Sequence, residues 1–293
     1  MAEASGTAEA RERVRKLVER VQRLPTLPSV LNTINQMILN PRTSAKEVVQ
    51  VIASDPALTS KVLRVANSPF YGFPNRITTI THANVILGFN TIKSIILSST
   101  IFDVFGRNLK HGDFDRTEFW KHSIGCGAAA RVIGRRLNYP RLEELFIAGL
   151  LHDVGKIVLD QFLPDKFVEV LNLVRSRDIL IVEAEAQVLG TTHAEIGAWL
   201  FEIWNLPKGL VETTRCHHNP ALASDSPKFA EIIHVADILV RAIRFGNGGD
   251  SRIPVLNGGV WNSLGLQETE LDDLLSQIGR EIEGAMIFLE FIR

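Results

Sequence analysis

The chain has 293 residues, of which 45% are apolar and 22% are charged, and this composition excludes a disordered or fibrous protein. Its 32 basic residues against 33 acidic ones lack the basic excess of a general nucleic-acid-binding protein. Two cysteines cannot form a disulfide framework, and the polar N-terminus has no signal-peptide core.

The most apolar stretch covers residues 85–105 and is interrupted by Asn90, Lys93 and several hydroxyl side chains. That pattern is not typical of a transmembrane span. We therefore expect a cytoplasmic globular protein that binds neither a membrane nor, directly, a nucleic acid. Its length suits one large domain or two modest ones.

The first half of the chain shows helical periodicity, with apolar residues at three- and four-residue steps. Prolines and candidate capping residues divide it into segments. The predicted helices cover residues 11–24, a segment that begins at Ser29 and ends at Pro41, residues 45–53 capped by Thr43 or Ser44, residues 56–65, a segment capped by Thr81, and residues 91–105.

A polar segment with two glycines, residues 106–115, predicts a boundary before the second half. Further helices are expected near residues 116–138, 141–160, 164–177, 180–189, 193–204, 207–218, 227–245 and 267–290. Residues 246–265 lack clear periodicity and predict a lid or a packed irregular loop. No period-two alternation indicates a sheet, so the predicted fold is all-α with two helical subdomains. Their expected limits are 1–23 for an N-terminal helix, 24–110 for the first subdomain and 111–293 for the second.

Histidines and acidic residues follow one another in a regular order through the second subdomain. Glu118 and His122 are four residues apart, so they share one helix face and can reach a common ion. The other candidate ligands are His152, Asp153, His193, His217, His218 and Asp237. Asp237 lies within an apolar helix, where a bare carboxylate needs a cation or a strong hydrogen-bond partner.

The seven candidates other than Glu118 exceed the four ligands of one tetrahedral zinc site. They suit two divalent ions about 3.5–4 Å apart with a bridging carboxylate. Imidazole and carboxylate ligands are compatible with iron, manganese, zinc or nickel, and the ligand types do not separate these metals. Two such ions leave a positive charge that suits a phosphate and lowers the pKa of a bridging water, so the predicted chemistry is phosphoester hydrolysis.

Each candidate also has a purely structural explanation. His152 and Asp153 are also explained as a buried hydrogen-bonded pair, and His217-His218 as paired histidines on a solvated helix end. His193 is also explained as an exposed residue at a helix start, where Thr192 and Glu195 form a capping box. Glu118 is an ordinary residue for a solvated helix. Lys156 is interpreted either as a surface lysine or as a phosphate ligand. Cys126 and Cys216 are interpreted as small buried apolar residues.

Several motifs resemble known families. Residues 148–156, AGLLHDVGK, resemble the signature of HD-domain phosphohydrolases, and residues 193–198 followed by His217-His218 are similar to the HD-GYP branch, which cleaves cyclic di-GMP. LPTLP at 24–28, DPALT at 55–59, RVANS at 64–68 and Leu87-Gly88 resemble the HDOD family, an HD-related output domain of bacterial signalling. These motifs occur in that family's order over roughly residues 20–290.

The resemblance implies the same ligand set, with His122 from the first helix, the pair His152-Asp153, and Asp237 as the closing aspartate. It places Glu118 where three-metal sites carry an extra glutamate, and it implies catalytic roles for Asp153 and Lys156, the latter on a substrate phosphate. The sequence departs from the hydrolases after His218, where NPALA at 219–223 replaces the GYP-bearing loop.

Two functions follow from this resemblance. The first is a bacterial regulatory protein with a retained metal site that binds a phosphate-bearing ligand or a signalling partner. The second is an active metal-dependent phosphohydrolase acting on nucleotides or cyclic dinucleotides. Closure of the metal site by residues 246–265 would favour regulation, because hydrolysis needs an accessible coordination position.

Overall fold

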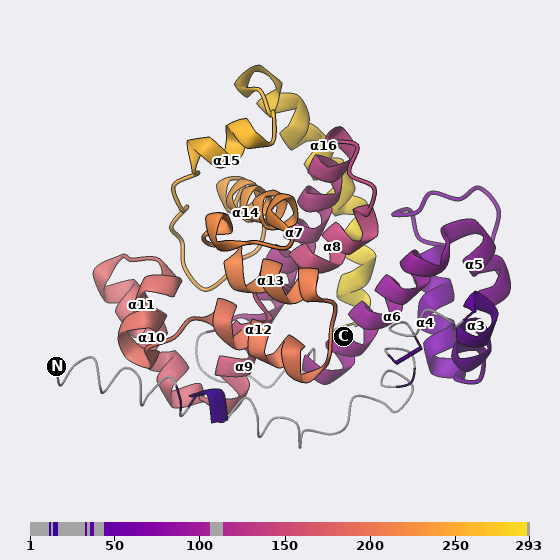
Figure 1. Ribbon diagram of the computed structural model, residues 1–293, viewed down its shortest axis with the longest axis horizontal. Coiled ribbons are helices and arrows are strands. Elements are labelled where there is room, and N and C mark those ends of the chain that lie inside the picture. The colour runs from indigo at the N-terminus through magenta and orange to yellow at the C-terminus, as the bar shows by residue number, and fades with distance from the viewer. Residues whose placement is uncertain are drawn as a thin grey trace. The chain divides into compact units, whose positions relative to one another are not determined.

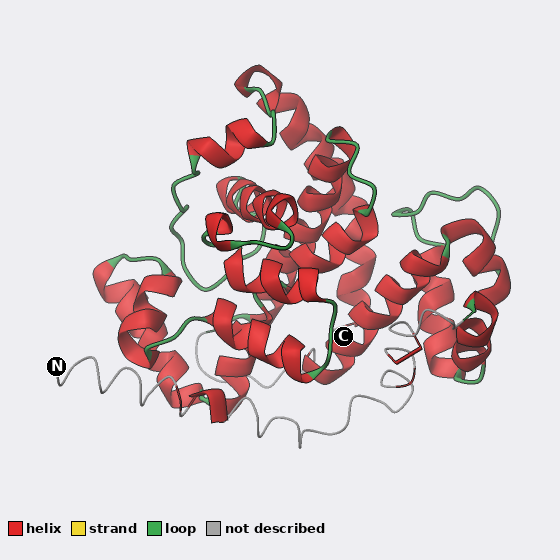
Figure 2. Cartoon of the chain, viewed as in Figure 1, coloured by secondary structure: helices red, strands yellow, loops and turns green. Residues whose placement is uncertain are grey.

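The computed structural model describes residues 44–105 and 114–291, together with positions 12, 14–16, 33, 36 and 37. The motif at 24–28, the segment between Ser29 and Pro41 and most of the predicted helix 11–24 therefore lie outside the described residues, as does most of the boundary segment 106–115. Within the described ranges every regular element is a helix and no strand occurs (Figure 2). The predicted all-α fold is confirmed.

The chain divides into two compact units. The larger unit is built from Asn108–Ile278 with Met1–Arg23, and the smaller unit joins Leu24–Arg107 to Gly279–Arg293. The last residues of the chain thus pack with the smaller unit, although they follow the larger one in sequence.

The smaller unit is a cluster of short helices that the sequence caps individually. Its described helices are α3 (Ala45–Ala53), α4 (Pro56–Ala66), α5 (Ile80–Leu87), α6 (Phe89–Phe105) and the 3₁₀ segment η4 (Met286–Phe291) (Figure 1). Ser44 and Glu47 form a capping box on α3, and the Asp55 carboxylate caps α4. Thr79 caps α5, two residues before the predicted Thr81, because its hydroxyl accepts from the His82 backbone N–H.

Helix α6 is apolar and largely buried. In the described part of the chain, no single helix is both long and apolar enough to cross a bilayer. Helices α5 and α6 reach that composition only as a pair, and they are bent by 117° at Gly88.

The larger unit holds the remaining helices, which are α7 (Arg116–Arg136), α8 (Leu142–Leu151), α9 (Val154–Phe162), α10 (Pro164–Arg177), α11 (Ile181–Leu189), α12 (His193–Ile203), α13 (Lys208–Cys216), η2 (Pro220–Leu222), α14 (Pro227–Ala242), α15 (Gly258–Ser263), η3 (Glu268–Glu270) and the first part of α16 (Leu271–Ala285). Helices α12, α13 and α14 lie side by side in that order, and α7 packs against both α8 and α14 (Figure 1). Most predicted helices match these within a few residues.

Two glycines bring helix backbones unusually close at the centre of the larger unit. A Cβ atom at Gly149 of α8 would lie 2.6 Å from the Cys126 carbonyl oxygen of α7. One at Gly155 of α9 would lie 2.0 Å from the His193 carbonyl oxygen of α12. Neither position can accept a side chain, so these glycines fix the distances between the helices that carry the candidate ligands.

The helix predicted over residues 141–160 is interrupted. It ends at Leu151, and Asp153 precedes the first residue of α9. His152 and Asp153 therefore lie at a junction between two helices rather than on one continuous face. The break lets both side chains face the same interior point, which two adjacent residues of a straight helix, about 100° apart, cannot do easily.

Candidate metal centre

Seven of the eight predicted ligands come together in the interior of the larger unit. Their nitrogen and oxygen atoms form two groups, in each of which all the ligand atoms lie within 4.8 Å of one another. Group A contains His122, Cys126, His152 and Asp237, and group B contains Asp153, His193, His217 and His218. All are buried except His218, which is partly exposed.

Asp153 connects the two groups through its two carboxylate oxygens. Its Oδ2 atom lies 3.4 Å from His152 Nε2 and 3.7 Å from His122 Nε2, both in group A. Its Oδ1 atom lies 3.0 Å from His193 Nε2 and 3.6 Å from His217 Nε2, both in group B. The carboxylate is thus placed between two ligand sets, as a bridging ligand would be.

Hydrogen bonds from Nδ1 orient three of the imidazole rings. The Nδ1 atom of His152 lies 2.7 Å from the Gly149 carbonyl oxygen, and that of His217 lies 2.7 Å from the Thr214 carbonyl oxygen. A carbonyl can only accept, so Nδ1 carries the proton in both rings and the Nε2 lone pair faces the centre.

His193 is held by a carboxylate instead. The Glu185 side chain accepts from both the His193 backbone N–H, at 2.8 Å, and from Nδ1, at 2.6 Å. This carboxylate–imidazole arrangement fixes the ring and makes Nε2 a more basic metal ligand. The predicted capping box is only half present, because Thr192 accepts from the Glu195 backbone N–H whereas the Glu195 carboxylate accepts from Thr191.

The donor set fits a bound cation. Among the described residues, His152 Nε2 is fully buried and has no hydrogen-bond partner, and Asp153 Oδ1 makes no hydrogen bond of acceptable geometry. His193 Nε2 lies 2.9 Å from His218 Nε2 and 3.4 Å from His217 Nε2. Several nitrogen and oxygen lone pairs thus point toward one another with too few hydrogen atoms between them to form hydrogen bonds. Buried polar atoms without hydrogen bonds need another partner, such as a cation.

The carboxylates of the centre are held in their charged form. Burial raises the pKa of Asp153, but its electrostatic interactions with His152 and Lys156 outweigh burial and hold that pKa well below its ordinary value. Burial likewise opposes ionisation of Asp237, and the Arg241 guanidinium outweighs it. Both carboxylates are therefore available as anionic ligands.

The imidazoles divide into two classes. Burial lowers the pKa of His217 to about 4, lowers that of His218 well below its ordinary value and also lowers that of His122. Burial also disfavours the charged form of His193, but the Glu185 carboxylate outweighs it, so that pKa is raised. At neutral pH three of these ligands are neutral, which is the form that binds metals.

Two buried cations accompany the carboxylates. Lys156 is fully buried, and its Nζ atom lies 2.6 Å from Asp153 Oδ2, so the interpretation of Lys156 as a surface lysine is wrong. The Arg241 Nε atom donates to Asp237 Oδ1 at 3.1 Å. Each of these two carboxylates thus has one cationic partner, which contacts the same oxygen atom that faces the group A histidines.

Glu118 is the predicted ligand that the structure does not bring into either group. Its carboxylate accepts from Lys121 at 2.6 Å and is partly exposed, while its backbone carbonyl accepts from the Asn247 N–H at 3.0 Å. The side chain lines a pocket next to the centre rather than the centre itself.

Residues 246–252, here called the covering loop, lie directly over one side of the centre. A Cβ atom at Gly246 would lie 2.2 Å from the His122 backbone nitrogen, and one at Gly248 would lie 3.4 Å from Asp153 Oδ2 and 3.3 Å from Lys156 Nζ. The loop is anchored by Asp250, which pairs with Arg241 at 2.7 Å and accepts from the Ile181 backbone N–H at 3.0 Å. Of the two predictions for this segment, the packed loop describes these residues.

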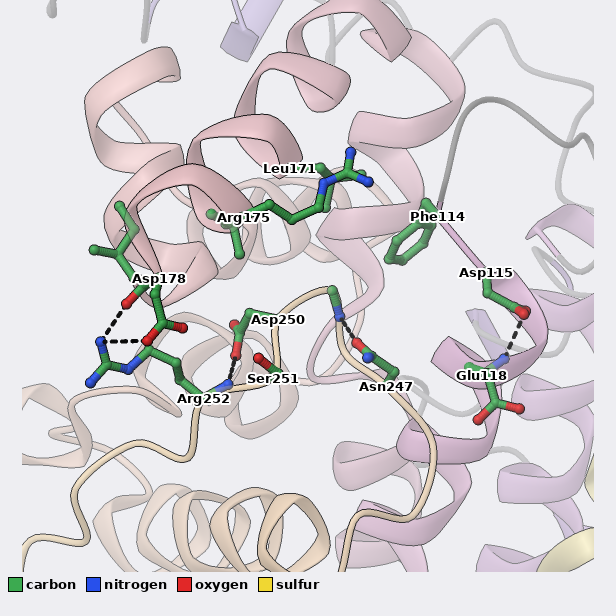
Figure 3. A pocket seen from close by; sticks show the side chains of 13 residues that line it. Phe114, Asp115, Glu118, Leu171, Arg175, Asp178, Asn247, Asp250, Ser251 and Arg252 are labelled. Atoms are coloured by element: carbon green, nitrogen blue, oxygen red, sulfur yellow. Dashed lines mark hydrogen bonds and ion pairs between the residues drawn. The ribbon is translucent and has the colours of Figure 1, made fainter.

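A pocket of about 420 Å³ lies next to the covering loop (Figure 3). Its wall includes Phe114 and Glu118 on one side, Arg175 of α10 on another, and Asp250 and Arg252 of the loop (Figure 3). The covering loop therefore lies between this pocket and the candidate ligands, since Gly246 and Gly248 approach His122 and Asp153 whereas Asp250 and Arg252 line the pocket.

Sequence reasoning missed Glu185, Arg241 and the position of Cys126. Arg241 lies on the largely buried helix α14, so the same test that selected Asp237 could have found it, whereas Glu185 lies on α11, where buried and exposed residues alternate and give no such signal. Cys126 follows His122 by four residues, which puts both on one helix face. Its Sγ atom lies 3.5 Å from His122 Nε2.

Comparison with known proteins agrees with this architecture. The family model for the HDOD domain matches residues 24–220. An uncharacterized protein of Treponema pallidum (strain Nichols) is 28% identical over 233 residues, which is 79% of this chain. The match covers only 44% of that longer relative.

Two crystal structures share the fold. An HDOD domain protein with unknown function from Geobacter sulfurreducens is 26% identical, with a TM-score of 0.78 over 94% of this chain and 98% of that one. A structure from Marinobacter aquaeolei VT8, named as a candidate signal transduction protein, is 24% identical, with a TM-score of 0.77 over 98% of this chain and 66% of that one. Since the family model also covers more than half of the sequence, the chain belongs to the HDOD family.

Proposed function

We propose that this protein is a bacterial signal-transduction module with a retained HD-type metal centre that binds a phosphate-bearing ligand. The observation that carries the proposal is the pair of ligand groups joined by Asp153 and closed on one side by the covering loop. A signalling partner protein would read the state of this centre.

The two groups support a centre with two divalent transition-metal ions. Group A offers His122, His152 and Asp237, and group B offers His193, His217 and His218, with one Asp153 oxygen facing each group. Nitrogen and oxygen donors of this kind suit iron, manganese, zinc or nickel. Bound ions of this class supply Lewis acidity and an electrostatic site for anions.

The charges of the centre favour an external anion. Asp153 is paired with the buried Lys156, and Asp237 shares the buried Arg241 with Asp250, so buried cations already offset part of the carboxylate charge. Two divalent ions would then leave the centre strongly positive. A phosphate group is the ligand chemistry that offsets such a charge, and the partly exposed His218 is where it can approach.

The covering loop favours regulation over catalysis. Hydrolysis needs a coordination position that a substrate can reach, whereas a closed site has a structural or sensing role. The backbone at Gly246 and Gly248 lies against His122 and Asp153, and the anchoring pair Arg241–Asp250 is itself buried. A ligand that binds at the centre would therefore either move the covering loop or compete with it for the same space.

The second candidate function is a metal-dependent phosphohydrolase acting on nucleotides or cyclic dinucleotides. Its support is the complete ligand set together with the partial exposure of His218, which leaves one approach to group B. Asp153 and Lys156 would then contact the reacting phosphate. In the present conformation the Lys156 ammonium is bonded to Asp153 instead.

Elemental analysis of the protein purified without chelator, in parallel with Asp153→Ala, tests the metal centre. We expect about two transition-metal ions per chain in the wild type and their loss in the variant, because the bridging carboxylate serves both groups. The exposed variant Asp165→Ala is the matched control and should keep the full metal content. A wild type that binds no metal even after reconstitution would refute the centre.

The choice between regulation and hydrolysis is tested on the metal-loaded protein. We expect inorganic phosphate or a cyclic dinucleotide to bind. We expect no turnover of the cyclic dinucleotide in assays that measure phosphate release and separate the products. Turnover that requires metal and disappears in Asp153→Ala would instead establish the phosphohydrolase.

A further inference from the structure

Cys126 lies in group A, although its sequence context indicates only a small buried apolar residue. It follows His122 by one helical turn on α7 and is completely buried. Its Sγ atom lies 3.5 Å from His122 Nε2 and within 4.8 Å of the ligand atoms of His152 and Asp237. A cysteine that only filled space would face apolar side chains, whereas this sulfur faces two imidazoles and a carboxylate.

An independent observation points to a ligand at this place. His152 is fully buried, and its Nε2 atom has no hydrogen-bond partner among the described residues. The hydrogen bond from His152 Nδ1 to the Gly149 carbonyl leaves Nε2 with a lone pair directed into group A. Group A therefore contains a ligand nitrogen, His152 Nε2, whose lone pair has no partner and which lies near the sulfur.

The backbone of Cys126 lies where α7 packs closely against α8. The Gly149 Cα is so close to the Cys126 backbone that a Cβ atom there would lie 2.6 Å from its carbonyl oxygen. Gly149 also orients His152 through its own carbonyl. Gly149 therefore contacts the Cys126 backbone and also holds the His152 ring, which places the two residues close to each other.

We propose that Cys126 is a thiolate ligand of the ion held by His122, His152 and Asp237. This inference rests on the proposed metal centre and specifies one half of it. On binding, the S–H bond is replaced by an S–metal bond and the proton leaves to solvent, with no change in oxidation state. One sulfur with two nitrogens and one oxygen favours a borderline-soft ion such as zinc, cobalt or iron in group A over magnesium or manganese.

Cobalt(II) is the probe that tests this assignment, because thiolate coordination adds a sulfur-to-cobalt charge-transfer absorption in the near ultraviolet. The full-length protein is stripped with chelator and titrated with Co²⁺ as wild type, Cys126→Ala and Cys216→Ala. Cys216 is also buried but lies outside both groups, so it is the matched control. We expect the charge-transfer band in the wild type and Cys216→Ala and its loss in Cys126→Ala, with the visible ligand-field bands retained.

The possible results separate this inference from the proposed function. Ligand-field bands without a charge-transfer band in the wild type would refute the Cys126 ligand and leave the metal centre intact. A folded wild type that binds no cobalt would refute the metal centre as well. If Cys126→Ala does not fold, X-ray absorption of cobalt-loaded Cys216→Ala decides the question, since a sulfur neighbour supports the ligand and its absence refutes it.

Discussion

The two units bury polar groups in opposite ways. In the smaller unit two buried hydroxyls of α6 bond to their own helix, Ser98 to the Ser94 carbonyl at 2.9 Å and Thr100 to the Ile96 carbonyl at 3.0 Å. The larger unit instead buries imidazoles, carboxylates, a lysine and an arginine around one point. A helix can satisfy a hydroxyl locally, but such a cluster is satisfied only by partners from other helices or by bound ions.

The comparison predicts that the larger unit depends strongly on its charge pairs. Replacing Asp153 by alanine removes the partner of the fully buried Lys156. We expect a loss of about 3–5 kcal/mol in the free energy of unfolding, together with loss of metal. Urea unfolding of the metal-free protein measures this change.

The double variant Asp153→Ala/Lys156→Met isolates the cause. It removes the unpaired charge, so it should recover much of the lost stability without recovering metal. If the double variant were as unstable as Asp153→Ala, the unpaired lysine would not be the reason.

Arg241 links the metal centre to the covering loop. Its side chain pairs with both Asp237 and Asp250, and replacing it by methionine leaves two buried carboxylates without their cation. We expect a loss of stability on the order of 3 kcal/mol and faster amide exchange of residues 247–252. Arg244→Met is the control, because Arg244 lies three residues further along the chain and is exposed. Unchanged exchange in the loop would contradict its anchoring by Arg241.

The metal-free protein should lose stability in mild acid. Burial lowers the pKa of His217 to about 4, below the ordinary value of 6.5 that the unfolded chain keeps. The unfolded state therefore binds the extra proton first, so this stabilisation is complete above pH 6.5 and is lost as the pH falls toward 4. The loss from this residue is on the order of 3 kcal/mol.

His122 and His218, whose pKa values are also lowered, act in the same direction. His193 acts in the opposite direction, because its raised pKa contributes stability below pH 6.5 that is lost as the pH rises through it. Urea midpoints of chelator-treated protein between pH 7.5 and 4.5 measure the balance. A midpoint that rises on acidification would show that the His193 contribution dominates.

Glu185 acts on the metal through His193. Glu185→Gln keeps the shape of the side chain but removes the charge that orients and polarises the ring. We expect metal affinity to fall about 10- to 100-fold, which a competition titration against a chromophoric chelator measures. Glu169→Gln, on an exposed surface, should leave the affinity unchanged.

The smallest effect is expected in the smaller unit. Lys61 and Asp103 form an ion pair that is partly open to solvent. Asp103→Asn should change the free energy of unfolding by less than about 1 kcal/mol and leave the metal content unchanged. A larger change would mean that charge pairs matter equally in both units, which would remove the contrast between them.

The helices were largely predictable because their signals are local. The periodicity and caps of residues 45–66 predict α3 and α4 closely, and Asp55 caps the second helix as expected. The break between α8 and α9 was not predictable in this way. Residues 142–160 are apolar enough to form one helix. The break lies at His152 and Asp153, whose side chains face one interior point.

The candidate site was predictable as a set of residue types and an order, because metals require imidazoles and carboxylates. Seven of the eight predicted ligands do lie together, whereas Glu118 instead faces the adjacent pocket. Glu185, Arg241 and Cys126 were not predicted. Each lies within eight residues of the ligand that it contacts, but only the packing of the helices buries it at the centre.

The sequence by itself determined the helical fold class, the family resemblance and the ligand types, since periodicity, capping and coordination chemistry are written in neighbouring residues. The tertiary structure decided which atoms meet. Close helix approach at Gly149 and Gly155 sets the distances between ligands, and burial sets their protonation. The covering loop lies over the centre because Arg241 bonds to Asp237 and Asp250 together, and such a contact exists only once the helices have packed.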